Sequence, residues 1–130
     1  MNIKQASIFL SRIALFLIYF WFGLLKVIGQ SPAGPMVQNL LSLTTPFMPF
    51  GLFIVLFGLF EMLIGVLFII PGQERKALIV FFLHMITTAL PLFMMSEVWT
   101  NIMVPTLEGQ YIFKNIALVA CAITIWASKK

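Results

Sequence analysis

The chain has 130 residues, enough for one domain, and 62% of them are hydrophobic whereas only 9% are charged. A soluble domain carries roughly 25% charged residues, so this composition cannot cover a surface that faces water. It excludes a soluble enzyme, a nucleic-acid-binding protein and a disordered tail, and it predicts an integral membrane protein. The net charge of +4 comes from eight basic and four acidic residues, so their placement matters more than their sum.

Four segments are long and apolar enough to cross the roughly 30 Å hydrocarbon core of a bilayer as helices. In chain order they cover residues 6–28, 50–71, 77–95 and 111–127. The first could be mistaken for a secretory signal peptide, but Arg12 interrupts it and no A-x-A cleavage pattern closes it, so we expect it to be retained. The sequence therefore predicts one all-α domain over residues 1–130, an integral membrane four-helix bundle.

The first loop has a pattern of its own. Residues 31–35 (SPAGP) form a turn cluster, residues 36–44 are rich in apolar side chains, and residues 45–49 (TPFMP) close the segment. This pattern predicts a short helix over 36–44 that lies in the membrane interface, over the mouth of the bundle. An irregular connection is the alternative.

Basic residues predict the orientation of the bundle, because cytoplasmic segments carry an excess of Lys and Arg. The loops at 29–49 and 96–110 contain no Lys or Arg. We therefore expect both termini in the cytoplasm and these two loops outside. The basic residues at the termini and in the turn between the second and third spans are Lys4, Arg75, Lys76, Lys129 and Lys130.

Glycines recur every seven residues along the second span, at Gly51, Gly58, Gly65 and Gly72. Seven residues turn a helix through about 700°, so the set stays close to one face. Small residues allow a neighbouring membrane helix to approach closely, and we expect these glycines to pack against one. Glu61 lies between Gly58 and Gly65 on that face, near the middle of the span, and should point into the bundle.

The other spans carry polar stripes at the same seven-residue spacing. Four stripes that face inward would give the bundle a polar interior. Besides the stripe of the second span, which contains Glu61, they are Arg12, Tyr19 and Lys26 in the first span, His84 and Pro91 in the third, and Lys114, Cys121 and Ser128 in the fourth. Cys121 is the one cysteine, so no internal disulfide can form, and this excludes a dithiol oxidoreductase.

Glu61 needs a partner, because a charge at the bilayer centre costs at least about 2.5–3.5 kcal/mol. One hypothesis is a polar pocket that binds a headgroup, a quinone or an ion, or relays a proton, with Tyr19 able to gate it. The other is a buried ion pair that fixes the helix register. The candidate partners are Arg12, Lys26, Lys114 and His84.

The sequence contains no catalytic motif, so whether the protein is an enzyme stays open. His84 is the one histidine, which excludes a bis-histidine haem, and the shortage of ligands predicts no metal site.

Several short motifs share a pattern. They are Arg12, residues 21–26 (WFGLLK), Glu61 with Gly65, residues 72–75, and residues 109–115 (GQYIFKN). In these motifs the chain resembles the DoxX-like superfamily of small four-span membrane proteins. The WxGLLK and GxxxxK[DN] elements are most similar to the branch that includes inner-membrane proteins of reactive-chlorine resistance. One departure is that the family's Gly pair after the Glu is here reduced to Gly65.

The resemblance implies a bacterial inner-membrane protein with Arg12, Lys26, Glu61 and Lys114 as the family's polar positions. Some members are associated with thiosulfate:quinone oxidoreductase or with oxidative-stress complexes, and others look like assembly factors. We therefore expect a redox-associated membrane subunit whose intramembrane pocket binds a quinone- or lipid-like molecule. The alternatives are a chaperone-like accessory protein with a structural polar seam and a small proton-coupled transporter.

The expected partners follow from the same reasoning. They are membrane lipid and either another membrane protein or a second copy of the chain, and no nucleic acid. We expect no covalently bound cofactor; a quinone is the candidate for a reversible one.

Overall fold

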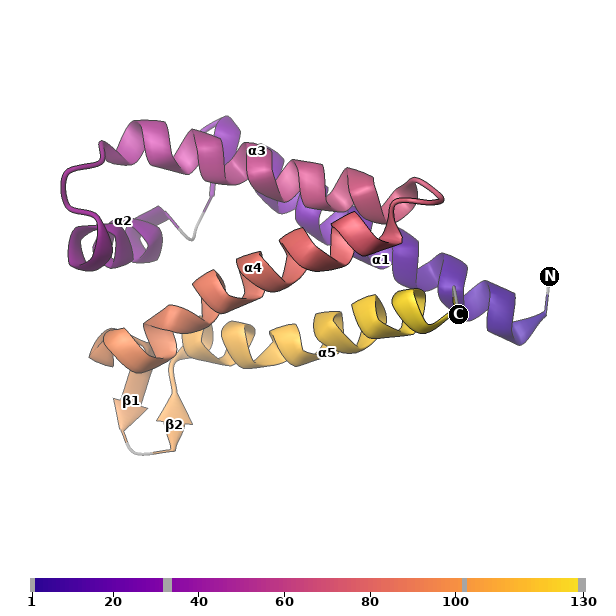
Figure 1. Cartoon of the computed structure of the whole chain (residues 1–130). Coiled ribbons are helices and arrows are strands. Elements are labelled where there is room, and N and C mark those ends of the chain that lie inside the picture. Colours follow the sequence, from indigo (N-terminus) through magenta and orange to yellow (C-terminus); the bar gives the residue numbers. More distant parts are fainter. Residues whose placement is uncertain (1, 32–33, 102, 129–130) are drawn as a thin grey trace.

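Four long helices form an antiparallel bundle in the computed structural model, which describes residues 2–31, 34–101 and 103–128 (Figure 1). They are α1 (Ile3–Val27), α3 (Phe50–Ile69), α4 (Glu74–Met94) and α5 (Leu107–Ala127). Both chain ends lie at one end of the bundle, which we call the termini end (Figure 1). The predicted all-α four-helix fold is confirmed, and each span was predicted to within a few residues.

The helix boundaries have local causes in the sequence. Asn2 and Gln5 form a reciprocal capping box at the start of α1, which satisfies backbone N–H groups that have no partner within the helix. Gly29 ends the same helix with φ 78°, a conformation that glycine adopts without steric cost. At the start of α5, the Thr106 side chain accepts a hydrogen bond from the backbone N–H of Gly109, 3.2 Å away.

The opposite end of the bundle, which we call the hairpin end, carries two connections. The short helix predicted in the first loop is present as α2 (Gly34–Thr44), and Leu41 is its buried residue. The second connection contains a 3₁₀ turn (Ser96–Val98) and the antiparallel strands β1 (Trp99–Asn101) and β2 (Val104–Pro105). This hairpin was not predicted, because strands this short between two spans give no clear period-2 pattern.

The outward surfaces of the four long helices are apolar. Leu10 is 64% exposed, Ile86 65% and Ile116 69%. Large apolar side chains exposed at so many positions would be unfavourable on a surface that faces water. Four helices are long and apolar enough to cross a membrane. The chain is therefore an integral membrane protein.

A layer of apolar side chains fills the centre of the bundle on the termini side of Glu61. All of its members are at most 1% exposed, and each of the four long helices contributes at least one of them. We call this set the apolar layer; it consists of Leu15, Ile64, Phe68, Phe81, Ala122 and Ile125.

Candidate functional site

Four polar side chains from three helices form a continuous buried chain near the middle of the bundle. Nζ of Lys26 on α1 lies 2.7 Å from Oε1 of Glu61 on α3. Nε2 of His84 on α4 lies 2.8 Å from Oε2 of the same carboxylate. The other ring nitrogen of His84, Nδ1, lies 3.0 Å from the hydroxyl of Tyr19 on α1. Each of the four residues is at most 7% exposed.

The antiparallel arrangement of α1 and α3 explains why Lys26 and Glu61 meet. Lys26 lies three residues beyond Gly23, and Glu61 lies three residues beyond Gly58, which faces Gly23 across the helix contact. The Cα atoms of Lys26 and Glu61 therefore lie on opposite sides of the glycine contact, each about 4.5 Å from it along the helix axis. Side chains on a helix lean toward its N-terminus, so the two side chains lean back toward each other.

The hydrogen bonds of this chain can all point toward Glu61. With Glu61 ionised, His84 donates from Nε2 to the carboxylate, which leaves Nδ1 free to accept the proton of the Tyr19 hydroxyl. Lys26 supplies the balancing positive charge to Oε1. A neutral histidine in one tautomer therefore satisfies both of its neighbours.

The two oxygens of the carboxylate have different partners. Oε1 of Glu61 is buried and accepts no hydrogen bond of good geometry among the described residues, although Nζ of Lys26 lies 2.7 Å away. The contact with Lys26 is thus an ion pair held by charge. Buried acceptors are generally hydrogen-bonded, so Oε1 depends on the charge of Lys26 more than Oε2, which His84 contacts, does.

Aromatic rings enclose the histidine and keep its surroundings apolar. The ring of Phe57 stacks on His84 with centroids 5.2 Å apart, and Tyr19 meets it edge-on at 5.0 Å. Phe57 also lies under the ammonium of Lys26, 5.8 Å from the ring centre. Charge interactions are stronger in such a medium than in water.

Lys26 connects this chain to a cavity of about 110 Å³ at the hairpin end of the bundle. The cavity lies where the end of α1, the start of α2 and the start of α3 come together. Lys26 is its one charged lining residue among those described. We call it the hairpin-end cavity; it is lined by Lys26, Gly29, Ser31, Gly34, Phe50 and Ile54.

A second ion pair lies on the other side of the apolar layer. Arg12 of α1 lies 3.5 Å from Glu74 at the start of α4, and it donates a hydrogen bond to the carbonyl of Phe68 at 2.8 Å. Glu74 in turn accepts from the backbone N–H of Gly72. Arg12, which the sequence offered as a partner of Glu61, thus serves the turn between α3 and α4, and sequence reasoning missed Glu74.

The stripe expected on the fourth span faces the interior only in part, since Cys121 packs against the buried core but Lys114 does not. Lys114 is exposed, with its ammonium 5.0 Å from the ring centre of Tyr111, and it takes no part in the chain around Glu61. Instead Ala122 and Ile125 turn inward, both fully buried. A lysine near a helix end reaches the membrane interface from a lipid-facing position, so spacing alone could not assign its direction.

The glycine repeat of the second span divides into two pairs. A Cβ atom on Gly65 would lie 3.1 Å from the backbone of α1, and one on Gly58 would collide with it. Gly51 has open space around it, and Gly72, with φ 89°, lies beyond the end of α3 and forms the turn. The partner of Gly58 is Gly23, which the sequence pattern did not identify as a packing residue.

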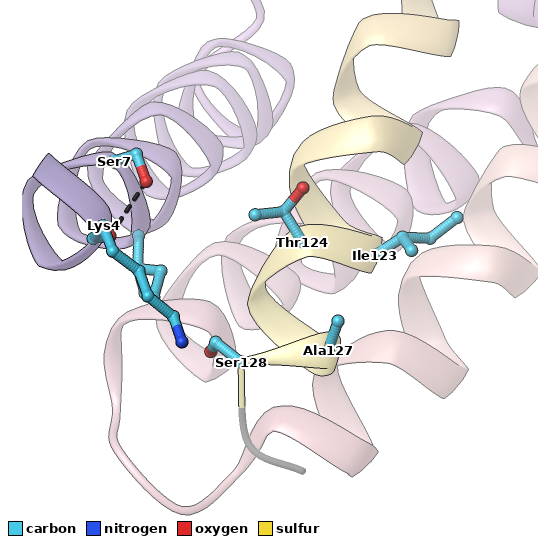
Figure 2. Close-up of a pocket in the computed structure, with 7 residues that line it drawn as sticks. Lys4, Ser7, Ile123, Thr124, Ala127 and Ser128 are labelled. Carbon is cyan, nitrogen blue, oxygen red and sulfur yellow. Dashed lines mark hydrogen bonds between the residues drawn. The ribbon is translucent and has the colours of Figure 1, made fainter.

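A larger cavity, of about 350 Å³, lies at the termini end between α1 and α5 (Figure 2). Its lining includes Lys4, Ser7, Thr124 and Ser128, far from Glu61. The three hydroxyls already donate to carbonyls of their own helices, at 2.7 to 2.9 Å. It is an open groove at the helix ends and lacks the buried, paired charges of the Glu61 chain.

No protein-family model, curated protein or solved structure matches the chain.

Proposed function

We propose that the protein is a redox-associated membrane subunit whose Glu61 site binds the polar head of a quinone- or lipid-like molecule. The observation that carries this proposal is the buried chain of Lys26, Glu61, His84 and Tyr19, which begins beside a cavity. Intramembrane ionisable residues are costly and usually functional. Here the ammonium of Lys26, which has three N–H donors, contacts Glu61 and also lines the cavity, so it can donate a hydrogen bond to a carbonyl oxygen of a ligand.

The redox association is supported by the resemblance to the DoxX-like superfamily at residues 21–26 and 109–115. The same resemblance supports a bacterial inner membrane as the location. The orientation is supported by the basic residues at the termini end, Lys4, Arg75 and Lys76, because the cytoplasmic side is enriched in Lys and Arg. We therefore place the termini end in the cytoplasm and the hairpin end outside.

One observation favours the accessory protein as a second candidate. His84 uses both ring nitrogens, and Lys26 and Glu61 balance each other's charge within the chain. A polar seam that satisfies itself could serve only to fix the helix register. The partner would then be another membrane protein or a second copy of the chain, and Glu61 would bind no small molecule.

Native mass spectrometry of the detergent-extracted protein, with and without added decylubiquinone, separates these two functions. We expect the wild type to carry an adduct of quinone or lipid mass and Glu61→Gln to lose it. Glu74→Gln is the matched control, because Glu74 is an equally buried carboxylate that is paired with a base of α1 at the other end. An adduct-free wild type that retains a partner protein would contradict the binding site and support the accessory role.

A further inference from the structure

The interior of the bundle is divided into two polar compartments with different access. Tyr19 and Arg12 are seven residues apart on α1, about 10 Å along the helix axis. Between them lies the apolar layer, in which Leu15, Ile64 and Phe81 are fully buried. Phe81 meets both Tyr19 and Phe68 edge-on, at 5.8 and 5.6 Å between centroids, so aromatic rings close the path toward the termini end.

At the hairpin end, one corner of the bundle, between the end of α1 and the starts of α2 and α3, holds a cavity. The buried apolar residues at this end come from α2, α4, the 3₁₀ turn and α5; they are Leu41, Pro91, Met95, Val98 and Ile112. Lys26, whose ammonium contacts Glu61, is also a wall of the hairpin-end cavity. Gly29 and Gly34 contribute no side chains to this cavity, and Phe50 and Ile54 provide an apolar side. At roughly 30 Å³ for each water molecule, a volume of about 110 Å³ holds three to four waters or a small ring with its oxygen substituent.

We propose that the hairpin-end cavity is the mouth of the Glu61 site and that the site exchanges ligand with the hairpin-end face alone. The ligand class is a neutral, ring-sized head with a hydrogen-bond-accepting oxygen. Lys26 supplies the donor, and its charge is already balanced by Glu61. An anion would have to displace that carboxylate, and a cation would meet the ammonium at the entrance.

This proposal rests on the proposed function for its ligand, but the access route has its own consequence. A site open at one face and sealed by the apolar layer at the other can bind and release a molecule without conducting it across the membrane. This access favours reversible binding over transport by a single copy of the chain.

The first test is cysteine accessibility in a Cys121→Ala background. Ile54→Cys lines the mouth, and Ile64→Cys, on the same helix, lies in the apolar layer. A small, charged methanethiosulfonate reagent should modify Ile54→Cys in the folded protein at least tenfold faster than Ile64→Cys. Equal rates at the two positions, or an unreactive Ile54→Cys, would overturn the assignment of the mouth, whatever the protein binds.

The second test fills the mouth. A Cβ atom on Gly34 would lie 3.9 Å from the ring of Phe50, so Gly34→Phe places a second ring at the wall of the cavity, whereas Gly51→Phe places the same ring in open space at the same end. We expect Gly34→Phe to weaken decylubiquinone binding at least tenfold and Gly51→Phe to change it less than twofold. Undiminished binding by Gly34→Phe would overturn the mouth but leave the Glu61 site intact. If the wild type binds neither quinone nor lipid, the proposed function and the ligand class fail, and the accessibility test still decides the route.

Discussion

Gly23 of α1 and Gly58 of α3 lie against each other so closely that a Cβ atom on either would collide with the backbone carbonyl oxygen of the other. A Cβ on Gly58 would also lie 3.0 Å from the Cβ of Lys26. This glycine contact sets the separation of the two helices, and with it the distance over which Lys26 reaches Glu61. Close packing and the polar site therefore share one structural cause.

Gly58→Leu should destabilise the bundle whatever its function. The added side chain must push α1 away or distort it, and overpacking of this kind costs about 1–3 kcal/mol or more. Thermal unfolding in detergent, followed by circular dichroism, measures the effect. Gly51→Leu is the control, because it adds the same side chain to the same helix where nothing lies within 4 Å. Equal melting temperatures for the two variants would mean that the glycine contact does not limit the packing of α1 and α3.

The fold could be predicted because a membrane span needs a long apolar run, which can be recognised in the amino-acid sequence. The heptad of Arg12, Tyr19 and Lys26 also predicted one inward face of α1 correctly, since all three lie in the interior. In the second span, Glu61 between Gly58 and Gly65 points inward for the same reason. Periodicity works here because polar groups avoid lipid.

The pairing of charges could not be predicted in the same way. Glu74 lies in a charged turn that resembles any solvated loop, and only the fold shows that this turn passes over Arg12. Lys114 fitted a seven-residue stripe but reaches outward, because a long basic side chain near a helix end tolerates either direction. Gly23 lies within residues 21–26, but it belongs to no repeat of glycines, so its sequence position did not identify it as a helix-packing residue.

A double-mutant cycle tests this assignment of partners. Arg12→Gln and Glu74→Gln should be coupled, because each removes the same ion pair on the termini side of the apolar layer. Arg12→Gln and Glu61→Gln should be additive to within about 0.3–0.5 kcal/mol, as expected for separated sites. Unfolding free energies from denaturant titration of the single and double variants and the wild type give both quantities. Stronger coupling of Arg12 to Glu61 than to Glu74 would contradict the two-compartment interior.

The ion pair of Lys26 and Glu61 allows stability and binding to be separated. Lys26→Met leaves a buried carboxylate without its cation, and loss of one partner of a buried pair costs about 3–5 kcal/mol. Adding Glu61→Gln removes the orphaned charge, so the double variant should recover most of the lost stability. It should not recover quinone binding, since the ammonium of Lys26 and the carboxylate of Glu61 are both gone.

Thermal unfolding and native mass spectrometry on the wild type, Lys26→Met and the double variant measure the two effects. If the polar seam is purely structural, the double variant recovers stability and the wild type carries no ligand. If the double variant is as unstable as Lys26→Met, the unpaired charge of Glu61 does not cause the instability of the single variant.

His84 reports directly on the geometry of the site, because it is the one histidine in the chain and gives one pair of ring-nitrogen signals. With ¹⁵N-histidine labelling, the neutral ring in the wild type should carry its proton on Nε2, which faces Glu61, and none on Nδ1, which faces the Tyr19 hydroxyl. Tyr19→Phe keeps the ring packed against Phe81 but removes the donor to Nδ1. The tautomer should therefore persist, because Glu61 still fixes it, while the Nδ1 resonance shifts.

Tyr19→Phe should also cost about 1–3 kcal/mol of stability, because it leaves a buried acceptor unsatisfied. Glu61→Gln provides the contrast, since an amide can donate as well as accept, and the preference for the Nε2-protonated tautomer should weaken. A wild-type ring protonated on Nδ1 would reverse the direction of the hydrogen bonds, because His84 would then donate to Tyr19 and could not donate to Glu61 while neutral. In that case Glu61 would have to supply the proton between them, and the carboxylate would be the donor of the site rather than its acceptor.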